Sequence, residues 1–226
     1  NIVSGLITNY PLNSNDKIYT LFEDSNKRLW AGMWSSGLKL FNRKTGHFDS
    51  VDLRYVHDDS FNHEQIGYII ELGTGNLLLA SRGGLIVFDP EKQQCITHWN
   101  QKQQNLINNT VISLFKDKDQ NIWVGHWTDG VDLYSPYHNQ FKVHEDFGGL
   151  LRGKIGSVHS FLELDGNLWI GTDVGLIAYN RKENKYSLYP VEQEEVRYLY
   201  AENEHTIWVS TCLLYTSPSP RDMRRS

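Results

Sequence analysis

One pattern recurs along the chain, and it limits the possible folds more than any other property of the sequence. It is a short apolar segment that opens on tryptophan and runs into a glycine-containing loop. The aligned residues are Trp30, Leu78, Trp123, Trp169 and Trp208, so successive copies stand 48, 45, 46 and 39 residues apart. A period of this length indicates an architecture in which each repeat is one supersecondary unit.

Each repeat contains four segments with β character. An apolar run such as "IYTLFED" is followed by an Asp/Asn/Gly turn and then by the tryptophan segment, as in "LWAGM". A loop, a third apolar segment such as "LKLF", a polar turn such as "NRKTGH" and a fourth segment complete the repeat. Four antiparallel strands at this period predict a blade of a β-propeller. The loops end at Gly37, Gly84, Gly130 and Gly175.

The predicted fold class is therefore all-β: a β-propeller fragment of about four and a half four-stranded antiparallel blades, an open arc of a larger propeller. We expect residues 1–14 to end a preceding blade, and residues 193–211 to form two strands of a truncated one. Complete blades are expected at 15–62, 63–107, 108–154 and 155–192. Because a propeller closes its ring to remove strand edges, we expect this to be an internal piece that folds poorly alone.

Composition excludes several classes of protein. The net charge is −5 and the basic residues do not cluster, which argues against nucleic-acid binding.

The last fifteen residues, "CLLYTSPSPRDMRRS", depart from every upstream pattern and resemble translated sequencing-adapter read-through. We expect residues 212–226 to be a non-native tail. Without it the net charge is −7 and Cys95 is the only thiol, which excludes an internal disulfide framework.

Several repeat positions are expected to be structural. The aligned tryptophans, Trp30, Trp123, Trp169 and Trp208, are predicted to pack in cores. A small residue follows two places later in the first four copies, which predicts a close approach between neighbouring sheets. These residues are Gly32, Ala80, Gly125 and Gly171.

The position four residues after the aligned one differs sharply between copies, and it is the main candidate for ligand binding. It holds Trp34, Arg82, Trp127 and Asp173, with His126 and Asp129 as polar neighbours of Trp127. An indole can stack on a sugar ring, and Arg or Asp can bind hydroxyls or carboxylates. The alternative is that the two tryptophans only pack on the rim of the next blade. Secondary candidates in the links between blades are Arg54, Tyr55, His57 and Arg152.

Other chemistries have little support in the sequence. Asp117, Asp119 and Asn121 begin a calcium-loop spacing, but Ile122 occupies the place of the required glycine, so we expect an ordinary turn. The nine histidines lack metal-ligand spacing. We expect no metal, no cofactor and no catalytic residues, and therefore no enzyme activity in this segment.

The pattern (G/N)-x-(L/I)-W-(I/V/A)-G-x-x-x-G-(L/V), with "NLINNTVISLF" leading into a new blade, resembles the two-component regulator propeller repeat over residues 15–211. That resemblance implies the periplasmic sensor region of a Bacteroidota hybrid two-component histidine kinase. Such a region recognises oligosaccharides from polysaccharide breakdown and signals across the inner membrane into a phosphorelay. The implied partners are an oligosaccharide, further blades and a connector domain, within a membrane-anchored, dimeric parent.

Two other functions stay open from the sequence. A propeller enzyme acting on glycans, a lyase or a hydrolase, would need convergent carboxylates or a Tyr/His pair on the loop face. A protein-interaction propeller of the WD type is disfavoured because no Trp-Asp dipeptide occurs and the tryptophan lies in the second strand of the repeat.

Overall fold

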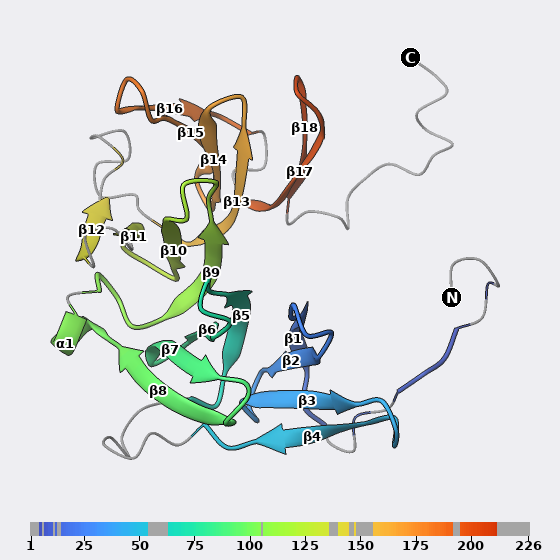
Figure 1. Cartoon of the computed structure of the whole chain (residues 1–226). Helices are drawn as coiled ribbons and strands as arrows, with labels where there is room; N and C mark the ends of the chain where they lie inside the picture. The colour runs from blue at the N-terminus through green and yellow to red at the C-terminus, as the bar shows by residue number, and fades with distance from the viewer. Residues whose placement is uncertain are drawn as a thin grey trace. The chain divides into compact units, whose positions relative to one another are not determined.

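The computed structural model confirms the all-β fold class, with four sheets of four strands and one of two (Figure 1). It describes residues 5, 7–10, 12, 15–53, 63–104, 106–135, 140–144, 147, 156–191 and 195–211. The chain divides into two compact units, Asn1–Val111 and Ile112–Ser226, which we treat separately. Each sheet is a meander in which sequential strands pair antiparallel, as expected for a propeller blade.

The first unit holds two blades. Blade 1 comprises β1 (Ile18–Glu23), β2 (Leu29–Met33), β3 (Leu38–Asn42) and β4 (His47–Val51). Blade 2 comprises β5 (Ile66–Glu71), β6 (Leu77–Ser81), β7 (Gly84–Asp89) and β8 (Gln94–Trp99), followed by one helical turn, α1 (Gln101–Gln104). Strands β1 and β2 both contact β5, so the two sheets lie side by side.

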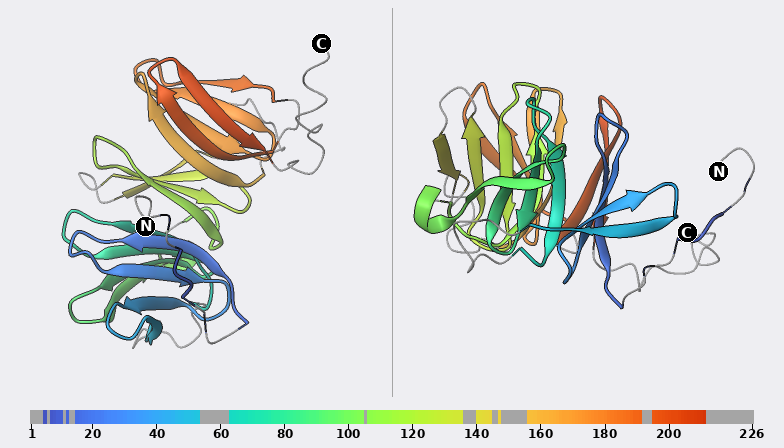
Figure 2. Two further views of the ribbon diagram at one scale, coloured as in Figure 1. Left: turned by 90° about the vertical axis from the view of Figure 1, so that its right-hand side faces the viewer. Right: turned by 60° about the horizontal axis from the view of Figure 1, so that its bottom comes forward.

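The second unit holds two further blades and a two-stranded sheet. Blade 3 comprises β9 (Val111–Lys116), β10 (Ile122–His126), β11 (Val131–Ser135) and β12 (Gln140–His144); blade 4 comprises β13 (Val158–Leu164), β14 (Asn167–Thr172), β15 (Gly175–Asn180) and β16 (Lys185–Tyr189). Strands β17 (Val196–Asn203) and β18 (Thr206–Thr211) form blade 5. Strand β10 contacts β13, and β13 and β14 contact β17, so these sheets also lie side by side (Figure 2).

Small residues in the second strands allow neighbouring blades to approach closely. A Cβ atom added at Gly32 would lie 2.5 Å from the carbonyl oxygen of Ile66, and one at Gly125 would lie 2.8 Å from that of Val158. At Gly171 the distance to the carbonyl oxygen of Val196 would be 3.0 Å. In each case this carbonyl oxygen belongs to a residue in the first strand of the next blade. A side chain at these positions would push the blades apart.

The repeated tryptophan completes the packing between blades where a full blade follows. Trp30 is fully buried and meets the ring of Phe88 edge-on, with ring centroids 5.8 Å apart. Trp123 is also buried and meets Tyr179 in the same way at 5.7 Å. Phe88 and Tyr179 occupy equivalent places in the third strand of the following blade. The interface therefore joins the second strand of one blade to the third strand of the next.

Trp208 does not pack in a core, which corrects the expectation from the repeat alignment. Its side chain is 61% exposed. Trp169, at the equivalent place in blade 4, is only partly buried and packs on Tyr189 of its own blade. The reason is that a third strand of blade 5 would cover Trp169 and a third strand of a following blade would cover Trp208, and the described residues contain neither strand.

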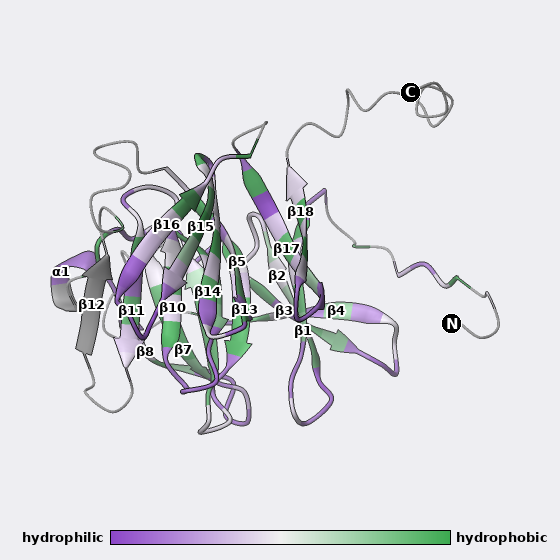
Figure 3. Ribbon diagram, turned by 90° about the horizontal axis from the view of Figure 1, so that it is seen from above, coloured by the Kyte–Doolittle hydropathy of each residue, from purple (hydrophilic) through white to green (hydrophobic). Residues whose placement is uncertain are grey.

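A buried carboxylate anchors two of the tryptophans. Asp24 and Asp117 open the turns before the second strands, and each accepts a 2.9 Å hydrogen bond from the indole N–H of the tryptophan six residues later. The carboxylate of Asp117 also accepts the backbone N–H groups of Asp119 and Asn121. This closes a turn, as the sequence predicts for these residues. Figure 3 shows the hydrophobic residues of the strands and the hydrophilic residues of the turns between them.

Candidate ligand-binding face

The loops between second and third strands lie on the same face of the blades as the links that lead into the next blade. In the first unit, the N–H of Gly37 in such a loop donates to the carbonyl oxygen of Glu64 at 2.6 Å. In the second unit, Ser157 donates its hydroxyl to the carbonyl oxygen of Trp127 at 2.6 Å. We call this face of each unit its loop face, and we call Trp34 and Arg82 of the first unit and Trp127 and Asp173 of the second unit the slot residues.

The slot residues emerge from buried strand ends. The residue before each of them is buried: Met33, Ser81, His126 and Thr172 are all at most 1% exposed. One place further on, Trp34 is 41% and Trp127 is 52% exposed. Arg82 is exposed and Asp173 is half-buried. In each unit, the sharp change from buried to accessible places two chemically different side chains where a ligand of that unit could meet them.

In the first unit, two slot residues from adjacent blades come together with a third side chain. The rings of Tyr19 and Trp34 stack with centroids 5.2 Å apart and planes 10° apart. The guanidinium of Arg82 lies over the Trp34 ring, 5.2 Å from its centroid. Tyr19 stands at an irregularity in the pairing of β1 with β2, between Ile18 and Thr20. We call these three residues the aromatic–arginine cluster.

In the second unit, Trp127 is the most accessible slot residue. Asp129, two residues on, adopts a positive φ of 77° and accepts a hydrogen bond from the hydroxyl of Thr128 at 2.7 Å. His126 does not reach the surface, which corrects its place among the ligand-contacting candidates. It is fully buried, with Nε2 2.9 Å from Oδ2 of the equally buried Asp132. His126 therefore supports the strand end beneath Trp127.

Asp173 belongs to a charged group at the starts of β13 and β17. The side chain of His159 is 7% exposed, with Nε2 3.5 Å from Oε1 of Glu195, which also pairs with Arg197. Burial and the positive charge of Arg197 lower the pKa of His159 to about 4, against the opposing effect of Glu195. Burial raises the pKa of Asp173, although the backbone N–H of Ser157 counteracts it. These four side chains form the charged cluster of the second unit.

Three residues of the two clusters were not predicted as site residues, although the sequence contains a signal for them. Tyr19, His159 and Arg197 all occupy the place skipped in the pairing of first and second strands. This place varies in chemistry from blade to blade, as the slot does, and that variation could have identified it. The secondary candidates Arg54, Tyr55, His57 and Arg152 lie outside the described residues.

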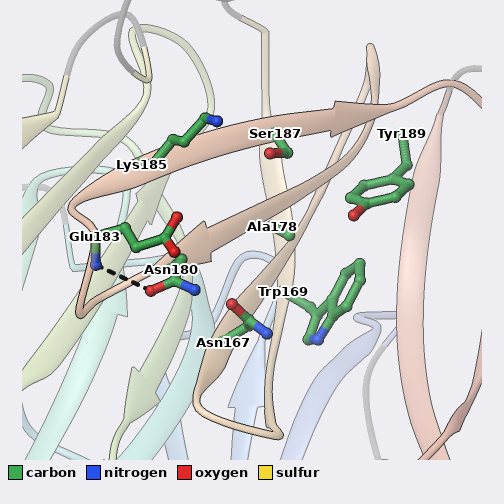
Figure 4. A pocket seen from close by; sticks show the side chains of 8 residues that line it. All are labelled: Asn167, Trp169, Ala178, Asn180, Glu183, Lys185, Ser187 and Tyr189. Carbon is green, nitrogen blue, oxygen red and sulfur yellow. Dashed lines mark hydrogen bonds between the residues drawn. The ribbon is translucent and has the colours of Figure 1, made fainter.

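Two pockets accompany these surfaces. One of about 380 Å³ adjoins the loop face of the first unit and is lined by Ser36, Gly37, Val51, Asp52, Leu53, His63 and Glu64. The other, about 260 Å³, lies on blade 4, with Trp169 and Tyr189 at one end and Asn180 and Glu183 at the other (Figure 4). The second pocket lies on the surface of blade 4 that a third strand of blade 5 would cover. We therefore interpret it as an uncovered blade face.

Neither a membrane-spanning helix nor a metal cluster was found in the described ranges. None of the helices there has both the length and the apolar character needed to cross a bilayer. No three His, Cys, Asp or Glu side chains gather there in a way that could hold a metal ion.

Four-stranded meander sheets, repeated around a buried tryptophan, place the chain in the class of β-propeller repeat proteins. Residues 11–35 and 105–128 match the family model described as two component regulator propeller, the family that the sequence pattern resembles. No curated protein matches the chain.

Solved structures share the fold. An extracellular domain assigned to the hybrid two component system BT4673 of B. thetaiotaomicron is 23% identical with a TM-score of 0.75, over 89% of this chain and 28% of that one. The corresponding domain of BT3049 from B. thetaiotaomicron is 19% identical with a TM-score of 0.68, over 88% and 26%. This chain thus spans about a quarter of those domains. A catalytically inactive virginiamycin B lyase from Staphylococcus aureus, with quinupristin, is 13% identical with a TM-score of 0.68, over 92% and 68%.

Proposed function

We propose that the chain is a ligand-sensing segment of a hybrid two-component sensor and that its loop face binds an oligosaccharide. The observation that carries this proposal is the set of slot residues. Each emerges from a buried strand end, yet the four differ in size, polarity and charge. A position used only for packing would favour similar residues, whereas recognition of an irregular polar ligand uses different ones.

The chemistry of the exposed slot residues suits a sugar. Trp127 is half-exposed, and among the described residues no ring or cation contacts its indole. An accessible indole can accept the C–H face of a pyranose ring. The carboxylates of Asp129 and Asp173 are acceptors for hydroxyl groups. In the first unit, the aromatic–arginine cluster combines ring surface with a donor, the guanidinium of Arg82, in place of these acceptors.

The family match and the two sensor-domain folds support the wider setting of the proposal. In that setting the segment lies in the periplasm, in a larger sensory region connected through the inner membrane to a histidine kinase. Ligand binding would act by favouring one conformation of the receptor over another through unequal affinity. Further blades, a connector domain and a dimeric parent are the partners that this reading requires.

Isothermal titration of the chain with a panel of plant and host oligosaccharides tests the binding function. We expect Trp127→Ala to weaken binding of any ligand found by about tenfold, since one stacked aromatic is worth on the order of 1 kcal/mol or more. Trp208→Ala is the matched control, because Trp208 is exposed but lies away from the slot. Equal affinities for wild type and Trp127→Ala would remove Trp127 from the site. A kinase domain encoded in the same reading frame would support the sensor assignment.

Glycan cleavage is a second candidate, because the charged cluster brings a histidine and two carboxylates together and one structure of similar fold is a lyase. The burial of His159 weighs against it, since only 7% of its side chain is exposed and proton transfer to a substrate needs direct reach. A reducing-sugar assay on the same panel decides. Product formation that His159→Gln abolishes would establish an enzyme and replace the binding-only function.

A further inference from the structure

We propose that the loop face of the first unit recognises an anionic oligosaccharide, with the carboxylate or sulfate group of the sugar held by Arg82. This inference rests on the proposed binding function and deepens it, because it assigns a charge to the ligand. The residues that carry it are Arg82 and the two rings of the aromatic–arginine cluster.

The pairing state of Arg82 sets it apart from the other described arginines. Arg28, Arg43, Arg181 and Arg197 each form an ion pair with at least one carboxylate. Arg82 forms none with any described residue, and its guanidinium lies over the indole of Trp34 instead. A guanidinium stacked on a ring keeps its N–H groups at the edge of the stack, where they can bind an oxyanion in bidentate fashion.

The cluster is organised before any ligand arrives. Trp34 is fixed by its backbone N–H, which donates to the carbonyl oxygen of Lys17 at 2.9 Å, and by its stack on Tyr19. Because Trp34 holds Arg82 in turn, less side-chain entropy is lost when an anion binds. The half-exposed ring of Tyr19 provides apolar surface for the body of the sugar.

Charges of both signs precede β1 beside the cluster, and they have different roles. Lys17, which is exposed, directly precedes β1 and adds a second positive charge close to the cluster in the chain. The carboxylate of Asp16 accepts hydrogen bonds from the N–H of Ser35 and the hydroxyl of Ser36. It therefore closes the loop that bears Trp34, and no carboxylate of a described residue pairs with the guanidinium of Arg82.

Binding of three tetrasaccharides tests the proposal: tetragalacturonate, which carries carboxylates; a κ-carrageenan tetrasaccharide, which carries sulfates only; and methyl-esterified tetragalacturonate, which is neutral. We expect Arg82→Gln to lower affinity for at least one anionic probe by about tenfold to hundredfold, the usual effect of losing a charge-assisted contact. Arg82→Lys should restore only part of it, because an ammonium cannot bind an oxyanion in bidentate fashion. Which anionic probe responds distinguishes carboxylate from sulfate recognition.

Arg43→Gln is the matched control, since Arg43 is an exposed arginine of the same unit that is paired with Glu23. It should leave all affinities unchanged, and circular dichroism should show that every variant is folded. Equal binding of the anionic probes by wild type and Arg82→Gln, or binding of neutral oligosaccharides alone, would overturn the inference and leave the proposed function standing. If no oligosaccharide in the wider panel binds, the proposed function fails, and the inference fails with it.

Discussion

The indole N–H of Trp123 donates a 2.9 Å hydrogen bond to the buried carboxylate of Asp117, six residues earlier in the chain. Trp30 and Asp24 repeat this bond at the same distance. In blade 2, where Leu78 replaces the tryptophan, the residue six places earlier is Leu72. Donor and acceptor are thus replaced together by apolar residues, which leaves no buried polar group unpaired.

An arginine guanidinium also binds the carboxylate of each tryptophan–carboxylate pair, but the arginine comes from a different part of the repeat in the two cases. Arg28 of blade 1 binds Asp24 at 2.6 Å, and Arg181 of blade 4 binds Asp117 of blade 3 at 2.9 Å. Each lies over the tryptophan ring, 5.7 and 5.9 Å from its centroid. Burial raises the pKa of Asp24, yet the hydrogen bonds from Trp30 and Arg28 outweigh it, so the pKa lies below its ordinary value.

Removal of the Asp117 carboxylate should destabilise the second unit substantially. We expect Asp117→Ala to lower the free energy of unfolding by about 3 kcal/mol, because it leaves Arg181 and the Trp123 N–H without their buried acceptor. The control is Asp119→Ala, since Asp119 binds the same arginine from an exposed position and should cost under about 1 kcal/mol. Urea titration followed by circular dichroism measures both, and similar losses for the two variants would contradict the assigned role of Asp117.

Close contact between blades predicts a strong effect of the smallest substitution. Gly32→Ala would place a methyl group 2.5 Å from the carbonyl oxygen of Ile66, and we expect a loss of about 1–3 kcal/mol from strain. Gly73→Ala in the same unit meets nothing within 4 Å and needs no positive φ. It should be neutral or slightly stabilising in the same urea titration. A neutral Gly32→Ala would show that blades 1 and 2 do not approach as closely as described.

The lowered pKa of His159 predicts a loss of stability in mild acid. Because the folded state holds this histidine neutral to about pH 4 while the unfolded chain protonates near pH 6.5, the stabilisation is complete above pH 6.5. It is lost as the pH falls through this interval, by up to about 3 kcal/mol. The raised pKa of Asp173 acts in the opposite direction but is common to wild type and His159→Gln. Thermal unfolding between pH 7 and pH 4 should show a shallower decline for the variant, and parallel curves would refute the assignment.

Cys95 should react slowly in the folded protein. Burial, with a smaller effect from Asp52, raises the pKa of its thiol to about 11, and its Sγ lies 3.0 Å from the carbonyl oxygen of Leu53. Only the thiolate reacts, so in a Cys212→Ser background alkylation by iodoacetamide at pH 8 should be on the order of a hundredfold slower than after denaturation. Equal rates before and after denaturation would show that the thiol is accessible.

The repeat pattern predicted much of the fold because its information is local. Strand alternation, turn residues and the glycines before the third strands lie within single repeats, and the sheets follow them. The burial of a tryptophan depends on the next blade, so Trp208 could not be judged from its own repeat. The ion pair of Arg181 with Asp117 joins residues 64 positions apart, and no short pattern predicts it.

The candidate site was predicted only in part. The slot position could be found because loop length is nearly constant between repeats. Tyr19, His159 and Arg197 were missed because an irregular strand pairing at these residues interrupts the simple alternation of a strand. His126 was misplaced for a different reason, because the sequence does not show that Asp132 provides it with a buried partner.

The contacts of Trp30 with Phe88 and of Trp123 with Tyr179 have a consequence for how such chains change in evolution. Each interface is shared between the second strand of one repeat and the third strand of the next, so it straddles the repeat boundary. Duplication or loss of one whole repeat by recombination, wherever the crossover falls within it, again places the aligned second-strand residue, Trp or Leu, beside a third-strand aromatic ring. The number of blades can therefore drift in whole steps, while the varied loop face is reassembled in new combinations.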